Sequence, residues 1–253
     1  MIRNAKPVHE RTGVKSYIIV LQNQIKAFVN LMIMERGERS LPIIRASNGS
    51  ALARELVEMG YKPKDLFLKC RRPYADMYTG AFRNHSVTDA TSVVIEGEAE
   101  RVLDLHLTLP ENVVRPIAMV KDNRILGYVE GHIDGRTMHS HRKLVIDAIK
   151  LDESTDGAIG TFSAKIREEF VDLGRRLIDL LRQLHAHGLG HGDVHYKNVI
   201  VESGSWIWLV DPLAPMPWYH TSDRKRMIME RDLERIEKIE ADIEKLLRSG
   251  RRC

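Results

Sequence analysis

The sequence HGDVHYKN at residues 191–198 gathers two histidines, an aspartate and an asparagine between segments that predict regular structure. Residues 162–187 before it carry apolar side chains every three or four positions, which is the spacing of an amphipathic helix. Residues 199–201 and 206–210 after it are short apolar runs that predict the two strands of a hairpin, and Asp211 follows the second strand directly. A helix, a loop and a hairpin in this order would hold the polar residues rigidly in one place, as a site requires.

Three of these side chains, Asp193, Asn198 and Asp211, carry oxygen atoms that can accept hydrogen bonds. The carbonyl oxygen of Asn198 and the carboxylate of Asp211 also suit a hard cation such as magnesium. The same residue types are also common in ordinary turns. His191 and His195 allow a zinc site, but the loop pattern argues against the helix that would align them.

The order of these residues resembles the catalytic loop of the protein-kinase-like superfamily. The His-Gly-Asp-x-His-x-x-Asn version is similar to that of aminoglycoside and choline phosphotransferases, and small atypical protein kinases such as the RIO kinases also use His-Gly-Asp. The resemblance covers about residues 65–236 and implies an α+β, two-lobed protein-kinase-like fold. A strand-rich, nucleotide-binding N-terminal lobe would span residues 1–135 and a short helical C-terminal lobe residues 136–253.

The same resemblance implies ATP and Mg²⁺ as ligands and a role for each residue of the loop. Asp193 and Asn198 would be catalytic, and Asn198 and Asp211 would bind the metal. His191 would brace the loop, and Asp232, in a charged helix, resembles the aspartate that supports the backbone of the catalytic loop.

The first half of the chain supplies candidates for the nucleotide-binding groups that the resemblance implies. Lys69, at the end of a short predicted strand, would bind the α- and β-phosphates, and Glu98 on the following helix would hold this lysine. Glu96 and Glu100 on the same helix are alternatives to Glu98. Glu130 is assigned to the nucleotide site because it lies in a stretch that resembles the fifth strand and hinge, whose backbone groups bind adenine.

The chain departs from the family pattern in ways that leave the acceptor open. It has no Gly-x-Gly-x-x-Gly loop, and residues 48–50, Asn-Gly-Ser, are its one plausible phosphate-covering turn. Asp211 is followed by proline and leucine instead of phenylalanine and glycine. The histidine at position 195, two residues after Asp193, resembles the pattern of the small-molecule kinases. The short helical lobe instead resembles that of the atypical protein kinases. The acceptor is therefore either a protein serine or threonine or a small polar molecule, and an inactive pseudokinase that binds a nucleotide or a partner is the alternative.

Composition is consistent with a globular protein in a reducing compartment. The chain has 253 residues, 43% of them hydrophobic, a net charge of +4 and only two cysteines. No apolar run reaches the ~18 residues that span a bilayer, and the polar start lacks a signal-peptide pattern, so we expect a cytoplasmic protein without a membrane span. Basic residues at 224–231 allow nucleic-acid binding, although the glutamates among them favour an ordinary solvated helix.

Apolar periodicity predicts the remaining elements. We expect a loop at residues 71–91 and a connector at 131–135. The predicted strands are residues 16–21, 25–33, 41–45, 65–70, 112–120 and 125–130, and the predicted helices are residues 50–59, 96–106 and 223–247.

Overall fold

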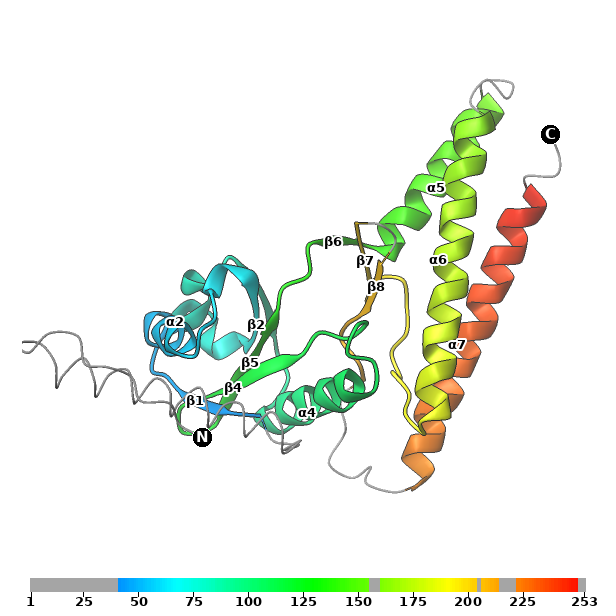
Figure 1. The fold of residues 1–253 in the computed structure, drawn as a ribbon. Helices are drawn as coiled ribbons and strands as arrows, with labels where there is room; N and C mark the ends of the chain where they lie inside the picture. Colours follow the sequence, from blue (N-terminus) through cyan, green and yellow to red (C-terminus); the bar gives the residue numbers. More distant parts are fainter. Residues whose placement is uncertain (1–40, 155–159, 204–205, 214–221, 250–253) are drawn as a thin grey trace, which may run out of the picture. The chain divides into compact units, whose positions relative to one another are not determined.

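The computed structural model describes residues 41–154, 160–203, 206–213 and 222–249, and these combine helices with two β-sheets in an α+β fold (Figure 1). Residues 41–253 form one compact unit. The hairpin predicted at residues 16–33 lies outside the described residues. None of the described helices is long and apolar enough to cross a membrane.

A five-stranded sheet carries the first half of the described chain. Its order is β1-β4-β5-β2-β3, and the strands are β1 (Ile43–Arg45), β2 (Leu66–Arg71), β3 (Asn84–Thr88), β4 (Pro116–Lys121) and β5 (Ile125–Gly131). The central pairs β4–β5 and β2–β5 are antiparallel, whereas the outer pairs β1–β4 and β2–β3 are parallel. Buried and half-buried residues alternate along β2, so this strand presents an apolar face and a polar face.

Two helices contribute to separate apolar clusters with this sheet. Helix α2 (Gly49–Glu58) packs Leu52 and Leu56 into the cluster that contains Leu68 of β2. Helix α4 (Ser92–Thr108) packs Ile95 and Ala99 against Tyr128 of β5 in a second cluster. The polar face of β2 therefore lies beside the cluster formed by α4.

The Asn48-Gly49 turn is the N-terminal cap of α2. The Asn48 side chain accepts a hydrogen bond from the backbone N–H of Ala51 at 2.9 Å, which satisfies one of the free amides of the first helical turn. Gly49 is buried, and a Cβ atom there would lie 2.7 Å from the carbonyl oxygen of Tyr78. The need for glycine at this position is thus explained by packing. Gly60 follows the C-cap residue Met59 and has a φ of +91°, the left-handed conformation that often ends a helix.

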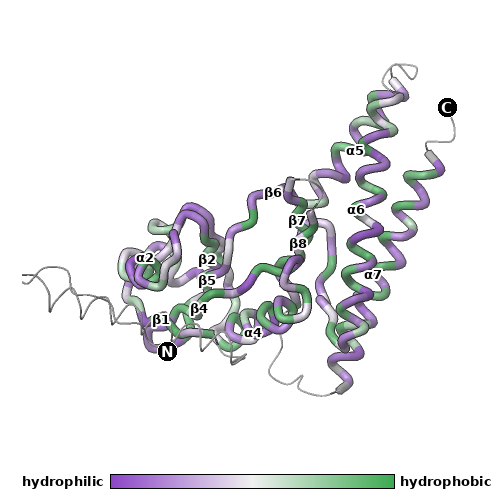
Figure 2. The backbone as a smooth tube through the Cα atoms, in the orientation of Figure 1, coloured by the Kyte–Doolittle hydropathy of each residue, from purple (hydrophilic) through white to green (hydrophobic). Residues whose placement is uncertain are grey.

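Helices dominate the second half. Strand β6 (Gly135–Thr137) pairs with β7 (Val199–Glu202), which pairs with β8 (Trp206–Leu209) in a three-stranded antiparallel sheet. The long helices are α5 (Met138–Ser154), α6 (Gly160–Ala186) and α7 (Ser222–Ser249), and α6 contacts both of the others. Hydrophilic and hydrophobic residues alternate along α6 and α7, as expected of helices with one buried stripe (Figure 2). The predicted boundary between residues 135 and 136 falls inside β6, the first strand of the second sheet.

One prediction about regular structure was wrong, and one long helix was missed. Residues 71–91 are not a loop but contain the 3₁₀ helices η2 (Arg72–Tyr74) and η3 (Thr79–Ala81), helix α3 (Ala75–Tyr78) and strand β3. This segment is ordered by burial, because Tyr78 is fully buried and its hydroxyl donates to the carbonyl oxygen of Ala46. Helix α5 was not predicted at all. A further short 3₁₀ helix, η1 (Pro63–Asp65), leads into β2.

Candidate active site

Lys69 lies at the centre of a group of charged side chains contributed by three distant parts of the chain. It points from the polar face of β2, where its cross-strand neighbour is Tyr128 of β5. Its Nζ atom lies 2.5 Å from Oε1 of Glu98 on α4 and 2.9 Å from Oδ1 of Asp211, which follows β8. Strand, helix and hairpin thus converge on one ammonium group, although Asp211 is 142 residues away in the sequence.

Glu98 is the glutamate that the structure brings to Lys69. It is buried, whereas the two alternatives, Glu96 and Glu100, are exposed. The hydroxyl of Tyr128 donates a second hydrogen bond to Oε1 of Glu98 at 2.8 Å. Two donors on one carboxylate oxygen hold this side chain in a fixed orientation, so Lys69 is positioned from its own strand and from the helix.

The electrostatic environment of this group differs from one residue to the next. Burial by itself would lower the pKa of Lys69, but the carboxylates of Glu98 and Asp211 more than offset it, and the pKa lies above its ordinary value. Glu130, on the strand that carries Tyr128, has a pKa raised to about 8, mainly by burial, with smaller contributions from Asp211 and Glu98 and an opposing one from Lys69. Lys69 is therefore positively charged at neutral pH, whereas Glu130 is largely protonated.

Asn198 ties together the two aspartates singled out in the sequence. Its Nδ2 atom donates to the backbone oxygen and to Oδ2 of Asp193, both at 3.1 Å, and to the backbone oxygen of Asp211 at 3.3 Å. In addition, the N–H of Val210 donates to the Asn198 carbonyl oxygen at 3.0 Å, which fixes the end of β8 to the loop. Asp193 and Asp211 themselves stay accessible, with 48% and 56% of their side chains exposed.

Asp232, on α7, binds the backbone at the start of the loop. This fully buried carboxylate accepts hydrogen bonds from the backbone N–H groups of His191 at 2.6 Å and Gly192 at 2.8 Å. The Nε2 atom of His185 lies 3.3 Å from it. Gly192 has a φ of +82°, a conformation that side chains disfavour, so the two amides can face the same carboxylate. The role expected for Asp232 agrees with these contacts.

His191 contacts backbone rather than other polar side chains. Its Nε2 atom lies 3.0 Å from the carbonyl oxygen of Val210, and its own carbonyl accepts from the N–H of Leu213 at 2.9 Å. Burial lowers the pKa of the His191 imidazole, so the ring is neutral and donates to Val210. His191 thus links the loop to both sides of Asp211.

The donor set fits a magnesium ion only in part. Among the described residues, no three His, Cys, Asp or Glu side chains lie close enough to hold a metal by themselves. Asp211 offers an exposed carboxylate, and the amide oxygen of Asn198 is left to accept because its Nδ2 donates to Asp193 and Asp211. Magnesium is usually held by one or two protein oxygens together with water and phosphate oxygens, so this incomplete set is of the kind that binds it with a nucleotide.

Two groups at this site were missed in the sequence. Tyr128 could have been found from strand register, since it lies opposite Lys69. The guanidinium of Arg101, on α4, donates to the backbone oxygen of Gly190 and so connects this helix to the start of the loop. No sequence pattern indicated Arg101, because its partner is a backbone atom far along the chain.

Comparison with known proteins gives no independent assignment, because no protein-family model matches the sequence and no curated protein matches it significantly.

Proposed function

We propose that this protein is an ATP- and Mg²⁺-dependent phosphotransferase of the protein-kinase-like superfamily, with the strand-rich and helical halves of the chain as its two lobes. The observation that carries the proposal is the contact of Lys69 with both Glu98 and Asp211. Kinases need a strand lysine that contacts phosphates, a helix glutamate that orients it and an aspartate that binds the metal. These three parts meet in this protein, and Asn198 links Asp211 to Asp193.

In the proposed reaction, the acceptor hydroxyl oxygen attacks the γ-phosphorus of ATP and forms the new phosphorus–oxygen bond. The bond from this phosphorus to the bridging oxygen breaks, and ADP leaves with the bonding electrons. The hydroxyl proton passes to the carboxylate of Asp193, whose Oδ2 is oriented by the amide of Asn198. Magnesium bound at Asp211 and Asn198 would neutralise charge on the phosphate oxygens.

Lys69 contributes a fixed positive charge for the α- and β-phosphates. Glu98 and Tyr128 hold it in place, and its raised pKa keeps it protonated. A nucleotide phosphate would take the position that Asp211 occupies at Lys69, which frees the Asp211 carboxylate for the metal. The backbone of β5 and of the connector after it is the proposed adenine site, and Glu130 lies on this strand.

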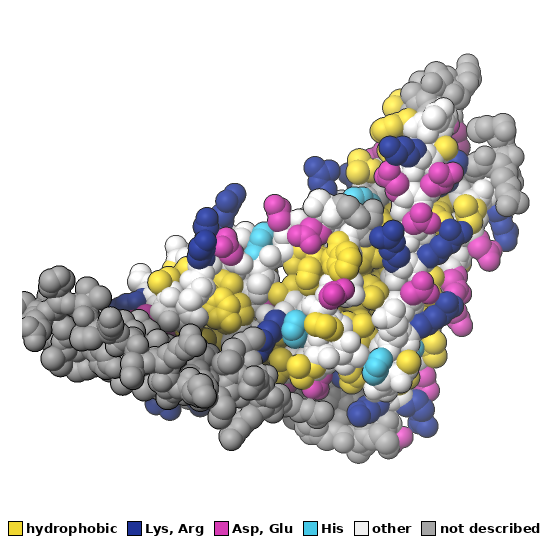
Figure 3. Space-filling model, in the orientation of Figure 1, with side chains coloured by type: hydrophobic (Ala, Val, Ile, Leu, Met, Phe, Trp, Pro, Cys, Tyr) yellow, Lys and Arg dark blue, Asp and Glu magenta, His cyan; other side chains and the backbone are white. Residues whose placement is uncertain are grey.

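A nucleotide-binding pseudokinase is the alternative, and two observations favour it. The ion pair between Lys69 and Asp211 engages both groups with each other, and the sequence Asp-Pro-Leu at residues 211–213 departs from the active pattern. Nucleic-acid binding has less support. Basic and acidic side chains are interspersed over α6 and α7 on the face seen in Figure 3, and several of them form ion pairs, such as Arg182 with Glu240.

A magnesium-dependent ATP-binding and turnover assay on the wild type and on Asp211→Ala tests the proposal. We expect the wild type to bind MgATP and form ADP, and we expect Asp211→Ala to lose both. A matched control is Asp147→Ala, which removes an exposed aspartate from α5 and should leave both unchanged. Binding without turnover would support the pseudokinase, whereas no binding by the wild type would refute the nucleotide site.

A further inference from the structure

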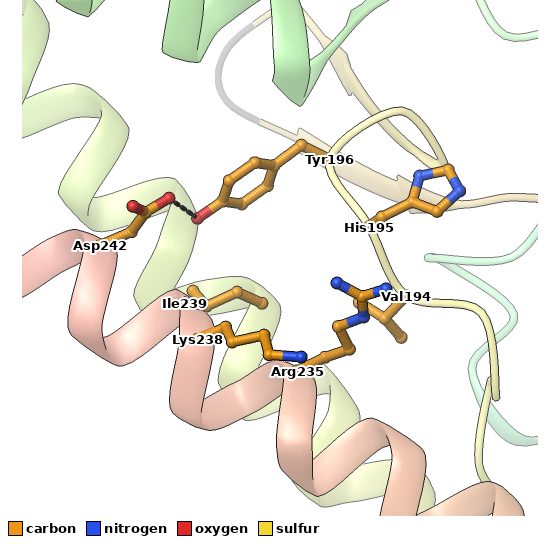
Figure 4. A pocket seen from close by; sticks show the side chains of 7 residues that line it. All are labelled: Val194, His195, Tyr196, Arg235, Lys238, Ile239 and Asp242. Atoms are coloured by element: carbon orange, nitrogen blue, oxygen red, sulfur yellow. Dashed lines mark hydrogen bonds between the residues drawn. The ribbon is translucent and has the colours of Figure 1, made fainter.

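A pocket lies between loop residues 194–196 and helix α7 (Figure 4). Loop residues 194–196, which follow Asp193, form one wall. A single stripe of α7 forms the other wall, because positions 235, 238, 239 and 242 follow the i, i+3, i+4, i+7 spacing of one helix face. The lining residues are Val194, His195, Tyr196, Arg235, Lys238, Ile239 and Asp242.

The one carboxylate that lines this pocket, that of Asp242, already has hydrogen-bond partners and a positively charged neighbour. Asp242 accepts two hydrogen bonds from the guanidinium of Arg142, at 2.9 and 3.1 Å, and one from the hydroxyl of Tyr196 at 3.1 Å. The guanidinium of Arg142 also lies 5.8 Å from the centre of the Tyr196 ring. Asp242 thus forms part of the rigid wall, and its negative charge is paired.

The two cations of the pocket have no such partners. Within the described part of the chain, the exposed side chains of Arg235 and Lys238 form neither an ion pair nor a hydrogen bond. Two other arginines of α7 are paired, Arg226 with Glu230 and Arg248 with Glu244. In Figure 4 the guanidinium of Arg235 lies beside Val194, and the ammonium of Lys238 extends along the helix towards Arg235.

His195 connects this pocket to the reacting group. It lines the pocket, and its Nε2 atom lies 3.7 Å from Oδ2 of Asp193. Its Nδ1 atom is buried without a hydrogen-bond partner among the described residues. An acceptor that occupies the pocket would therefore contact His195, the side chain that lies next to the Asp193 carboxylate.

We propose that this pocket binds an oxyanion, a phosphate or a carboxylate, carried by the acceptor close to the hydroxyl group that is phosphorylated. This proposal rests on the proposed phosphotransferase function and narrows its substrate class. An arginine and a lysine one helical turn apart are suited to such a group, because both donate charge-assisted hydrogen bonds to its oxygens. The residues of this pocket would bind and position the acceptor, and they would take no part in the bond changes of the reaction.

The test measures the binding of inorganic phosphate and of malonate to the full chain by ligand-observed NMR, without nucleotide and at constant ionic strength. The pocket variant is Arg235→Ala/Lys238→Ala. The control variant is Lys225→Ala/Lys245→Ala, which removes two exposed charges from the same helix away from the pocket. Because salt screens non-specific attraction equally in all samples, a difference between the variants reports the site. Equal thermal unfolding midpoints establish that all three proteins are folded.

We expect at least one of the two anions to bind the wild type and the control alike, and the pocket variant about tenfold more weakly or not at all. Tighter binding of phosphate would identify a phosphate-bearing acceptor, and tighter binding of malonate a carboxylate-bearing one. Equal binding by both variants, or no binding of either anion to the wild type, would overturn the proposal. The assay contains no ATP, so a failure of the phosphotransferase proposal would appear separately, as absent MgATP binding by the wild type.

Discussion

Replacing Asp232 with alanine tests how the loop at residues 191–198 is held, independently of any activity. Asp232 is fully buried and accepts two backbone N–H groups, from His191 at 2.6 Å and Gly192 at 2.8 Å. Hydrogen bonds to a charged acceptor contribute about 1.5–3 kcal/mol each, and a buried donor left without a partner costs about 1–3 kcal/mol. The alanine variant leaves both amides without an acceptor, so we expect a loss of about 3–5 kcal/mol in the free energy of unfolding.

Asp232→Asn gives a graded measurement should the alanine variant not fold. Asparagine keeps one oxygen acceptor but turns an NH₂ group towards the second backbone N–H, so only one of the two amides stays satisfied. We therefore expect about half of the alanine effect, roughly 2 kcal/mol. The matched control is Glu237→Ala, an exposed acidic residue on the same helix, for which a change within about 0.5 kcal/mol is expected.

Guanidinium denaturation followed by circular dichroism gives the free energies, and hydrogen exchange gives their location. The amides of His191 and Gly192 should exchange slowly in the wild type and much faster in Asp232→Asn, while the amides of the five-stranded sheet change little. A loss below about 1 kcal/mol in both variants, with unchanged exchange at these two amides, would refute the reasoning. Such a result would mean that the loop is held by its other contacts.

The remaining predictions concern the charged group around Lys69. Lys69→Met should cost about 2–4 kcal/mol of unfolding free energy in denaturation experiments, because it leaves the buried Glu98 without its cation. The double variant Lys69→Met/Glu98→Gln should recover part of that loss. If the unfolding free energies of the two single variants simply added up in the double variant, the two side chains would not stabilise each other. Glu130 has a pKa of about 8 when folded and near 4.5 in a free chain, so the folded state binds more protons over that range and stability should fall as pH rises through it. Glu130→Gln should flatten this pH dependence, and an unchanged slope between pH 5 and 8 would count against the raised pKa. Asp193→Asn should retain MgATP binding but reduce the rate of phosphoryl transfer by about 10²-fold or more, as measured in binding and turnover assays. An equal loss of MgATP binding and of phosphoryl transfer would assign Asp193 a structural role.

Elements with a strong apolar period were predictable from the sequence, and elements with few or irregularly spaced buried side chains were not. Helix α6 was expected at residues 162–187 and spans Gly160–Ala186, because its stripe of leucines repeats every three or four residues. Helix α5 has only three buried residues, Met138, Val145 and Ala148, so its pattern is too sparse to recognise. The segment at 71–91 looked polar because its buried side chains, Tyr78 and Phe82, are few and follow no regular period.

Parts of the candidate site that depend on local sequence could be predicted, and parts that depend on long-range packing could not. The spacing of Asp193, Asn198 and Asp211 is local, and the short loop and hairpin bring them together as expected. The choice of Glu98 over its neighbours depends on which face of α4 packs on the sheet, and only burial decides that. The phosphate-covering role considered for residues 48–50 has a simpler explanation, since Asn48 caps a helix.

The backbone of Asp211 ties the fold to the proposed chemistry. With a φ of 53°, Asp211 is the one non-glycine residue with positive φ in the described part of the chain, a conformation that costs on the order of 1 kcal/mol or more. Such a conformation persists only where surrounding contacts determine it. Here Asn198 donates to the Asp211 carbonyl oxygen, Lys69 binds its carboxylate, and His191 bonds the residues on either side. Glycine or asparagine at position 211 would relieve the strain. Glycine would remove the carboxylate, however, and asparagine would replace it with an uncharged amide. The strained aspartate is therefore explained by a requirement for a negative charge at this point, which the ion pair with Lys69 uses and which the proposed metal-binding role would also need.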